Sequence, residues 1–164
     1  MSLAVIVLAL VTLERGAELV WAQRNTRRLL ARGAQEEGAA HYPLIVALHA
    51  AWLAGLWLMA WNRAVSIPWL AVFVLLQLGR LWVLATLGER WTTRIIVLPG
   101  EALVRRGPYR MLRHPNYVVV AGEILVLPMA FGLVAYAIAF SLLNGAVLYL
   151  RIRAEEQALA RALP

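Results

Sequence analysis

Five long apolar stretches dominate this sequence and constrain its fold more than any other feature. They cover about residues 3–21, 42–61, 69–88, 115–131 and 133–150. A helix needs about 20 predominantly apolar residues to cross a bilayer, and the last two stretches are slightly shorter than that. With 62% hydrophobic residues among 164 and a mean hydropathy of +0.70, the chain is too apolar for an ordinary soluble domain. We therefore predict an all-α, polytopic membrane bundle of five transmembrane helices, forming one domain over residues 1–164.

The charges indicate how this bundle is oriented. A formal net charge of +7 could suggest a nucleic-acid partner, but every basic residue is arginine, and most lie between the apolar stretches. Residues 23–40, 89–113 and those after 150 hold nearly all of them, whereas only Arg63 marks the opposite side. The positive-inside rule then places the N-terminus outside and the C-terminus in the cytoplasm. We predict membrane lipids, and no nucleic acid, as partners of the arginines.

Other features exclude some chemistries and predict the connecting segments. The chain has no cysteine, which excludes disulfides and thiol catalysis, and its histidines and acids form no cluster typical of a metal site. No charged region precedes the first apolar run, so residues 1–13 should remain as part of a helix. We expect residues 23–40 to be a solvated connection, and residues 95–104 to form a small hairpin or capping loop around Pro99-Gly100.

Three apolar stretches contain charged residues, and those of the first and third suggest a pair inside the membrane. Glu14 and Glu18 lie one helical turn apart in the first stretch, and Arg80 lies in the third. A charge at that depth is costly unless it is paired. We therefore predict that Arg80 pairs with Glu14 or Glu18. His49, alone in the second stretch, is expected to be a packed and hydrogen-bonded residue.

A polar motif directly precedes the fourth apolar stretch. It reads Gly107-Pro-Tyr-Arg-Met-Leu-Arg-His-Pro-Asn-Tyr117. Pro115 suits the first turn of a helix, which places His114 at the mouth of that helix, where unpaired N–H groups favour an anionic ligand. The pattern predicts a ligand site at the membrane surface. A simpler alternative is that Arg110 and Arg113 only bind lipid phosphates.

Together with a glycine in the following helix and Arg151-Ile-Arg-Ala-Glu-Glu after the last one, this motif resembles the isoprenylcysteine carboxyl methyltransferase and phospholipid methyltransferase superfamily. Earlier signatures, such as Glu14-Arg-x-x-Glu-Leu and His41-Tyr-Pro, are similar to a bacterial membrane subgroup. Some of its members lie beside type III polyketide synthases and O-methylate alkylpyrones or alkylresorcinols. The resemblance implies an enzyme of the bacterial cytoplasmic membrane.

The resemblance also implies a cofactor, S-adenosylmethionine, bound on the cytoplasmic side in a half of the chain that covers about residues 89–164. A lipophilic acceptor would enter from the bilayer and be methylated on oxygen. The cofactor-binding residues implied are Tyr109, Arg113, His114, Pro115, Tyr117, Gly122, Arg151, Glu155 and Glu156. The candidate catalytic residues are His114, Glu123 and Arg110. His49 and Glu18 are further candidate bases.

Two rival functions belong to other classes. The first is a non-catalytic membrane scaffold that binds anionic lipid or a partner protein through its basic face. The second is an NADPH-dependent membrane reductase, because sterol reductases share distant features of the C-terminal half. The sequence alone does not name the methyl acceptor.

Overall fold

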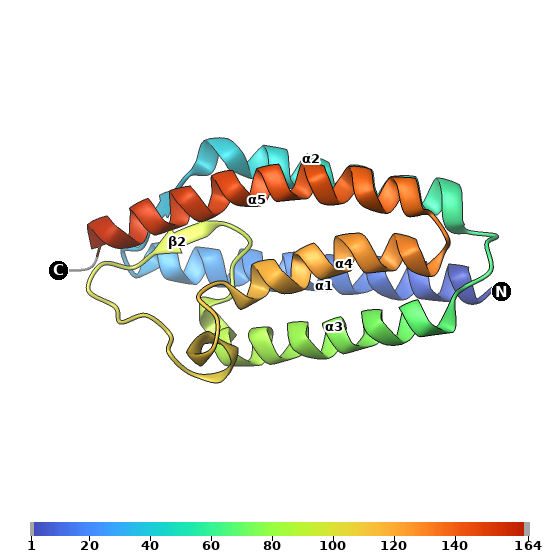
Figure 1. The fold of residues 1–164 in the computed structure, drawn as a ribbon. Helices are drawn as coiled ribbons and strands as arrows, with labels where there is room; N and C mark the ends of the chain where they lie inside the picture. Colours follow the sequence, from blue (N-terminus) through green and yellow to red (C-terminus); the bar gives the residue numbers. More distant parts are fainter. Residues whose placement is uncertain (1, 163–164) are drawn as a thin grey trace.

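The computed structural model describes residues 2–162, so Met1, Leu163 and Pro164 of the predicted domain lie outside the described residues. Five helices run side by side along the long axis of the molecule (Figure 1). They are α1 (Leu3–Ala31), α2 (Tyr42–Ala60), α3 (Ile67–Leu87), α4 (Pro115–Ala130) and α5 (Val134–Ala162). Within this range α2, α3 and α5 are long and apolar enough to span a membrane, and α4 is a shorter apolar helix. The predicted all-α membrane bundle is confirmed.

The helices begin where the sequence supplies suitable first residues. The side-chain oxygen of Ser2 accepts a hydrogen bond from the Val5 amide and caps α1. Proline stands in the first turn of α2, α3 and α4, where its missing N–H costs no helical hydrogen bond. Pro115 therefore starts α4, and His114 lies at its mouth as predicted.

The two ends of the bundle differ strongly in charge. At one end, the Ser2 hydroxyl donates to the Trp61 carbonyl, and the Ser66 amide donates to the Ala130 carbonyl. These bonds join the start of α1, the α2–α3 turn and the end of α4. The opposite end holds the long connections and the end of α5 (Figure 1). Most of the sixteen arginines belong to that second end. The side of the membrane that it faces stays a prediction.

The structure corrects two local predictions in part. Residues 23–31 are not a connection, because α1 continues to Ala31 and buries Asn25 and Leu29. Of the two alternatives for residues 95–104, the hairpin is absent, although a turn does form at Pro99-Gly100, where the Glu101 amide donates to the Leu98 carbonyl. Instead, β2 (Ile95–Val97) pairs antiparallel with β1 (Gln35–Glu37), with Ile96 opposite Glu36. The partner of β2 is therefore β1, a segment distant in sequence, and not the residues that follow Pro99.

Three apolar clusters hold the elements together. The largest joins α1, α2, α3 and α4 through residues such as Leu8, Leu56, Phe73 and Leu127. A second, of Ala22, Val83, Leu84 and Trp91, joins α1 to the end of α3. The third packs Ala158 of α5 on Ile95 and Val97 of β2. Outward-facing leucines on α1, α2, α3 and α5 are exposed, as expected for side chains that contact lipid.

A charged group lies inside the bundle between α1, α3 and α4. We call it the intramembrane network, and it comprises Glu14, Arg15, Glu18, Gln77, Arg80 and Glu123. Arg80 Nη1 lies 3.0 Å from Glu18 Oε2, which confirms the predicted pair. Arg80 also donates to both carboxylate oxygens of Glu123, a partner that the sequence did not reveal. The separate prediction for His49 is confirmed by a 2.8 Å contact between its Nδ1 and the Ile45 carbonyl.

Candidate functional site

A cavity of about 830 Å³ lies at the basic end, between the segment from η2 (Gly88–Arg90) to α4 and the end of α5. Its size is within the range of small-molecule sites, about 300–1,000 Å³. Apolar side chains from α1, the end of α3, β2 and the following loop form one part of the lining, and charged side chains form another. The cavity can therefore accommodate a ligand that has both apolar and charged parts.

The mouth of α4 and the last turns of α5 meet across this cavity. His114 lies between two carboxylates of α5, with Nδ1 3.8 Å from Glu155 Oε2 and Nε2 3.8 Å from Glu156 Oε1. Arg113 Nη1 lies 3.6 Å from Glu156 Oε1. Helical spacing puts Arg151 and Glu155 on one face of α5, toward α4. Segments about 40 residues apart in sequence thus form one polar group.

Tyr117, in the first turn of α4, connects the two sides of this group. Its hydroxyl accepts a 2.9 Å hydrogen bond from Arg151 Nε and donates to Glu155 Oε2. Arg151 Nη2 also donates to the Thr93 carbonyl at 2.6 Å. The ring of Tyr117 stacks on that of His114, with ring centroids 5.4 Å apart. The His114 ring therefore lies against Tyr117, between the two carboxylates. We call Arg113, His114, Tyr117, Arg151, Glu155 and Glu156 the cavity cluster.

Tyr109 contributes a phenol from the loop before α4. It lies in η3 (Gly107–Arg110), whose left-handed turn at Gly107 leaves no room for a side chain, because a Cβ there would lie 2.4 Å from Thr86 Oγ1. Burial, and to a lesser extent the charge of Glu155, raises the pKa of Tyr109 to about 12. At neutral pH its hydroxyl is therefore protonated and can only donate or accept hydrogen bonds.

Several polar atoms at the cavity lack a partner among residues 2–162. They are His114 Nε2, Asn116 Oδ1 and Trp91 Nε1. Buried polar atoms are normally hydrogen-bonded, so unpaired atoms along a cavity wall indicate a place where a ligand or water completes the contacts. Trp91 and Asn116 were not singled out from the sequence. Asn116 lies inside the motif, whereas nothing in the sequence distinguished Trp91 from a packing residue.

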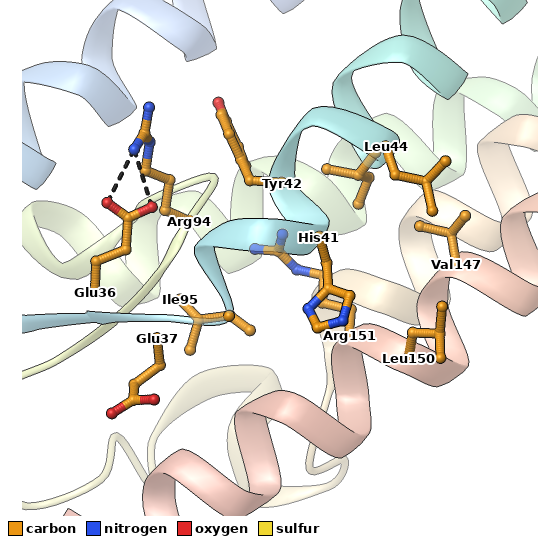
Figure 2. A pocket seen from close by; sticks show the side chains of 12 residues that line it. Glu36, Glu37, His41, Tyr42, Leu44, Arg94, Ile95, Val147, Leu150 and Arg151 are labelled. Atoms are coloured by element: carbon orange, nitrogen blue, oxygen red, sulfur yellow. Dashed lines mark hydrogen bonds and ion pairs between the residues drawn. The ribbon is translucent and has the colours of Figure 1, made fainter.

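A second, much smaller hollow adjoins the cavity at β1 and the start of α2 (Figure 2). It measures about 10 Å³, which is room for a single water molecule. Glu36 binds Arg94 Nη1 with both oxygens at 2.9 Å, and the Arg94 guanidinium lies over the Tyr42 ring, 4.5 Å from its centroid. Arg151 lines both hollows. We interpret the smaller one as structural support for the cavity wall.

The structure brings together most, but not all, of the residues suggested by the sequence. Those that line the cavity are Tyr109, Arg110, Arg113, His114, Tyr117, Arg151, Glu155 and Glu156. Three others lie elsewhere. Pro115 is buried at the start of α4, and Gly122 faces α3, where an added Cβ would lie 2.8 Å from the Leu76 side chain. Glu123 belongs to the intramembrane network.

The chemistry available at the cavity is charge recognition and proton transfer. Arginines can bind a carboxylate, glutamates can accept hydrogen bonds from hydroxyl or ammonium groups, and His114 can take or give a proton. Within residues 2–162, no group of three or more histidine or acidic side chains is placed to hold a metal ion.

Comparison with known proteins gives one family match and two similar bacterial proteins. The model of the isoprenylcysteine carboxyl methyltransferase family matches residues 69–161, a range that includes the whole cavity cluster. An uncharacterised protein of Bacillus subtilis, YpbQ, is 38% identical over 159 residues, covering 94% of this chain and 95% of that protein. An uncharacterised protein of Haemophilus influenzae is 28% identical over 153 residues, or 86% of each chain. No solved structure matches significantly. The chain is thus an integral membrane protein that belongs to the isoprenylcysteine carboxyl methyltransferase family.

Proposed function

We propose that this protein is an S-adenosylmethionine-dependent O-methyltransferase that acts on a lipophilic acceptor, with residues 89–162 forming most of the cofactor site. One observation carries the proposal. In a chain of a methyltransferase family, the mouth of α4 and the end of α5 meet at a cavity of about 830 Å³, with His114 between two carboxylates. The positive-inside rule supports a cytoplasmic location for this cavity.

The residues present fit the proposed cofactor. S-adenosylmethionine carries a methyl group on a positively charged sulfur, and it supplies that methyl for transfer. Arg113 suits its carboxylate, and Glu155 and Glu156 suit its amino group or ribose hydroxyls. The unpaired Asn116 Oδ1 and Trp91 Nε1 are an acceptor and a donor of the kind that an adenine or ribose would complete.

The protein's own contribution is mainly position and charge. The hydrogen bonds from Arg151 to Tyr117 and from Tyr117 to Glu155 hold one carboxylate in place before a ligand arrives. His114 lies between Glu155 and Glu156 at the cavity, which makes it the best placed residue there to accept a proton from a phenol or enol acceptor. Tyr109 cannot serve as that base at neutral pH, because its pKa is about 12.

A lipophilic acceptor fits the surroundings of the cavity. Leu103, just before the motif, and Met111 and Leu112, inside it, are large exposed apolar side chains, and exposed arginines lie between and beside them. Such a surface lies naturally at the membrane interface. We infer that an acceptor such as an alkylpyrone, an alkylresorcinol or a prenylated carboxylate would approach from the lipid with its polar group toward His114 and Arg110.

Calorimetry on the purified protein in detergent tests the cofactor. We expect S-adenosylhomocysteine to bind, and NADPH not to bind. A membrane reductase would give the reverse result, and a scaffold would bind neither compound. Transfer of a labelled methyl group from S-adenosylmethionine to hydrophobic acceptors of the three classes then tests the reaction. Absence of S-adenosylhomocysteine binding to a folded protein would overturn the proposed function.

A further inference from the structure

The intramembrane network contains more acidic than basic groups. Ion pairs join three carboxylates, of Glu14, Glu18 and Glu123, to two guanidinium groups, of Arg15 and Arg80. Glu18 lies 15 residues beyond the first residue of α1, or roughly 20 Å along the helix, and is therefore far from that end of the bundle. If all five groups were ionised, they would leave one negative charge inside the apolar bundle. Such an uncompensated charge is costly in a membrane.

Glu18 differs from Glu123 in its contacts and from Glu14 in its burial, since Glu14 also binds its partners through one oxygen, Oε2, but is more exposed. Glu18 Oε2 lies 3.0 Å from Arg80 Nη1 and 3.3 Å from Arg15 Nη1, whereas Glu18 Oε1 is buried and has no partner among residues 2–162. Glu123 uses both of its oxygens to bind arginines. The Glu18 side chain is not simply at the edge of the network, because only 8% of the residue is exposed.

This asymmetry fits a neutral carboxylic acid. An ionised carboxylate shares its charge between two oxygens, and both then need donors. In a carboxylic acid, one oxygen accepts hydrogen bonds and the other carries the proton, and a buried neutral O–H without a partner costs less than a buried charge without one. We propose that the network holds one proton at neutral pH, on Oε1 of Glu18, so that two ionised carboxylates face two guanidinium groups.

The other groups around the site limit where the proton can be. Glu14, also on α1, accepts a hydrogen bond from Gln77 of α3 and is more exposed than Glu18. On α4, Glu123 is the main partner of Arg80. His49 of α2 is near enough to Arg15, Arg80 and Glu123 for their charges to act on it. A proton on His49 would balance the network equally well and is the main competing arrangement.

The proton has a structural consequence at the cavity. It removes an uncompensated negative charge from the place where α1 packs against α3 and α4. α1 in turn supports the cavity, because Asn25 Nδ2 donates to the Gly88 carbonyl at 3.1 Å and to the Trp91 carbonyl at 2.9 Å. Leu29 of α1 and Trp91 both line the cavity. The bound proton thus helps to place one wall of the proposed cofactor site.

Two isosteric variants form a matched pair for the test. Glu18→Gln replaces a neutral acid by a neutral amide of nearly the same shape, so we expect a melting temperature close to that of the unchanged protein. Glu123→Gln removes an ionised partner of Arg80 and should melt at a clearly lower temperature. Equal losses in both variants would show that Glu18 is an ionised partner of Arg80, and would overturn the proposal.

Infrared spectroscopy detects the proton directly and does not depend on any variant. The experiment uses the unchanged protein at neutral pH in a detergent that has no ester group. We expect the C=O band of a protonated carboxylic acid, and we expect Glu18→Gln to lack it. Absence of the band from the unchanged protein would show that His49 or a bound cation balances the charge. A band that persists in Glu18→Gln would assign the proton to another carboxyl group. Either result would overturn the proposal.

Discussion

The intramembrane network and the cavity cluster are built from the same types of residue and differ in how much of each is exposed. The Arg80 side chain is 3% exposed and that of its partner Glu123 is 4% exposed. In the cavity cluster, Arg113 is 84% exposed and its partner Glu156 is 38% exposed. Buried charges must satisfy one another and thereby fix the helices. Exposed charges contribute little to stability, which leaves them available for a ligand.

Cysteine labelling should give the largest effect, an all-or-none result that tests whether the cavity cluster lies on the cytoplasmic side. The chain has no cysteine, so each single-cysteine variant has one reactive thiol. We expect a membrane-impermeant maleimide to label Arg63→Cys in intact cells, and Arg153→Cys only after permeabilisation. Leu56→Cys, at a position with no exposed surface, is the control that should stay unlabelled. Labelling of both arginine positions from the same side would contradict five spans.

Arg80→Ala should cause the largest loss of stability. Removing one partner of a buried ion pair typically costs about 3–5 kcal/mol, because the remaining charges stay buried without compensation. Thermal unfolding in detergent measures the effect. Arg63→Ala is the control, since Arg63 is exposed and its guanidinium contacts only a backbone carbonyl of its own turn. If the two variants unfold at the same temperature, the intramembrane network does not hold the helices together.

His114→Ala and Glu156→Ala should weaken ligand binding and leave stability nearly unchanged, the opposite of what we expect for Arg80→Ala. Each should weaken S-adenosylhomocysteine binding by about 1.5–3 kcal/mol, or roughly 10- to 150-fold, the range for hydrogen bonds to charged groups. Helical content and melting temperature should change little, because both residues lie at the rim of the bundle. Arg27→Ala, an exposed arginine of α1, should leave the affinity unchanged. Unaltered affinity in both cavity variants would show that the cofactor does not bind in this cavity.

Tyr117→Phe should give the smallest effect. It keeps the ring that stacks on His114 and removes only the hydroxyl between Arg151 and Glu155. Because this hydroxyl acts on the ligand only by holding Glu155, we expect less than the loss of a direct contact, about 0.5–1.5 kcal/mol, so calorimetry should show roughly 2- to 10-fold weaker S-adenosylhomocysteine binding. Tyr149→Phe is the matched control, because its hydroxyl bonds Arg153 on an exposed face of α5. An equal effect of the two changes would mean that Tyr117 does not organise the site.

The helices were predictable because membrane spans have a strong local signal. Apolar stretches and proline positions gave all five helices, and the start of α4 was predicted at the correct residue. The extension of α1 was missed although a signal existed. Ala22, Asn25 and Leu29 are buried at helical spacing, but the surrounding arginines suggested a solvated connection.

Long-range contacts were harder to predict. The pairing of β1 with β2 joins segments about 60 residues apart, and two strands of three residues each have no distinctive pattern. Glu123 was expected near the cofactor, but it binds Arg80. The sequence does not show this, because a single acid in an apolar helix does not reveal its partner. The association of the α4 motif with the α5 carboxylates was expected only from the resemblance to a family, because composition and periodicity do not predict which helices meet.

The pairing of β1 with β2 also limits how far the protein can be shortened. The region that matches the family begins at residue 69, so it includes β2 but neither β1 nor Asn25. A fragment of residues 69–161 would have an unpaired strand edge next to the cavity, and the carbonyls of Gly88 and Trp91 would lose their donor. Such an edge is prone to pair with another chain. The minimal functional unit therefore includes the N-terminal 40 residues, and fragments or fusions that omit them should aggregate.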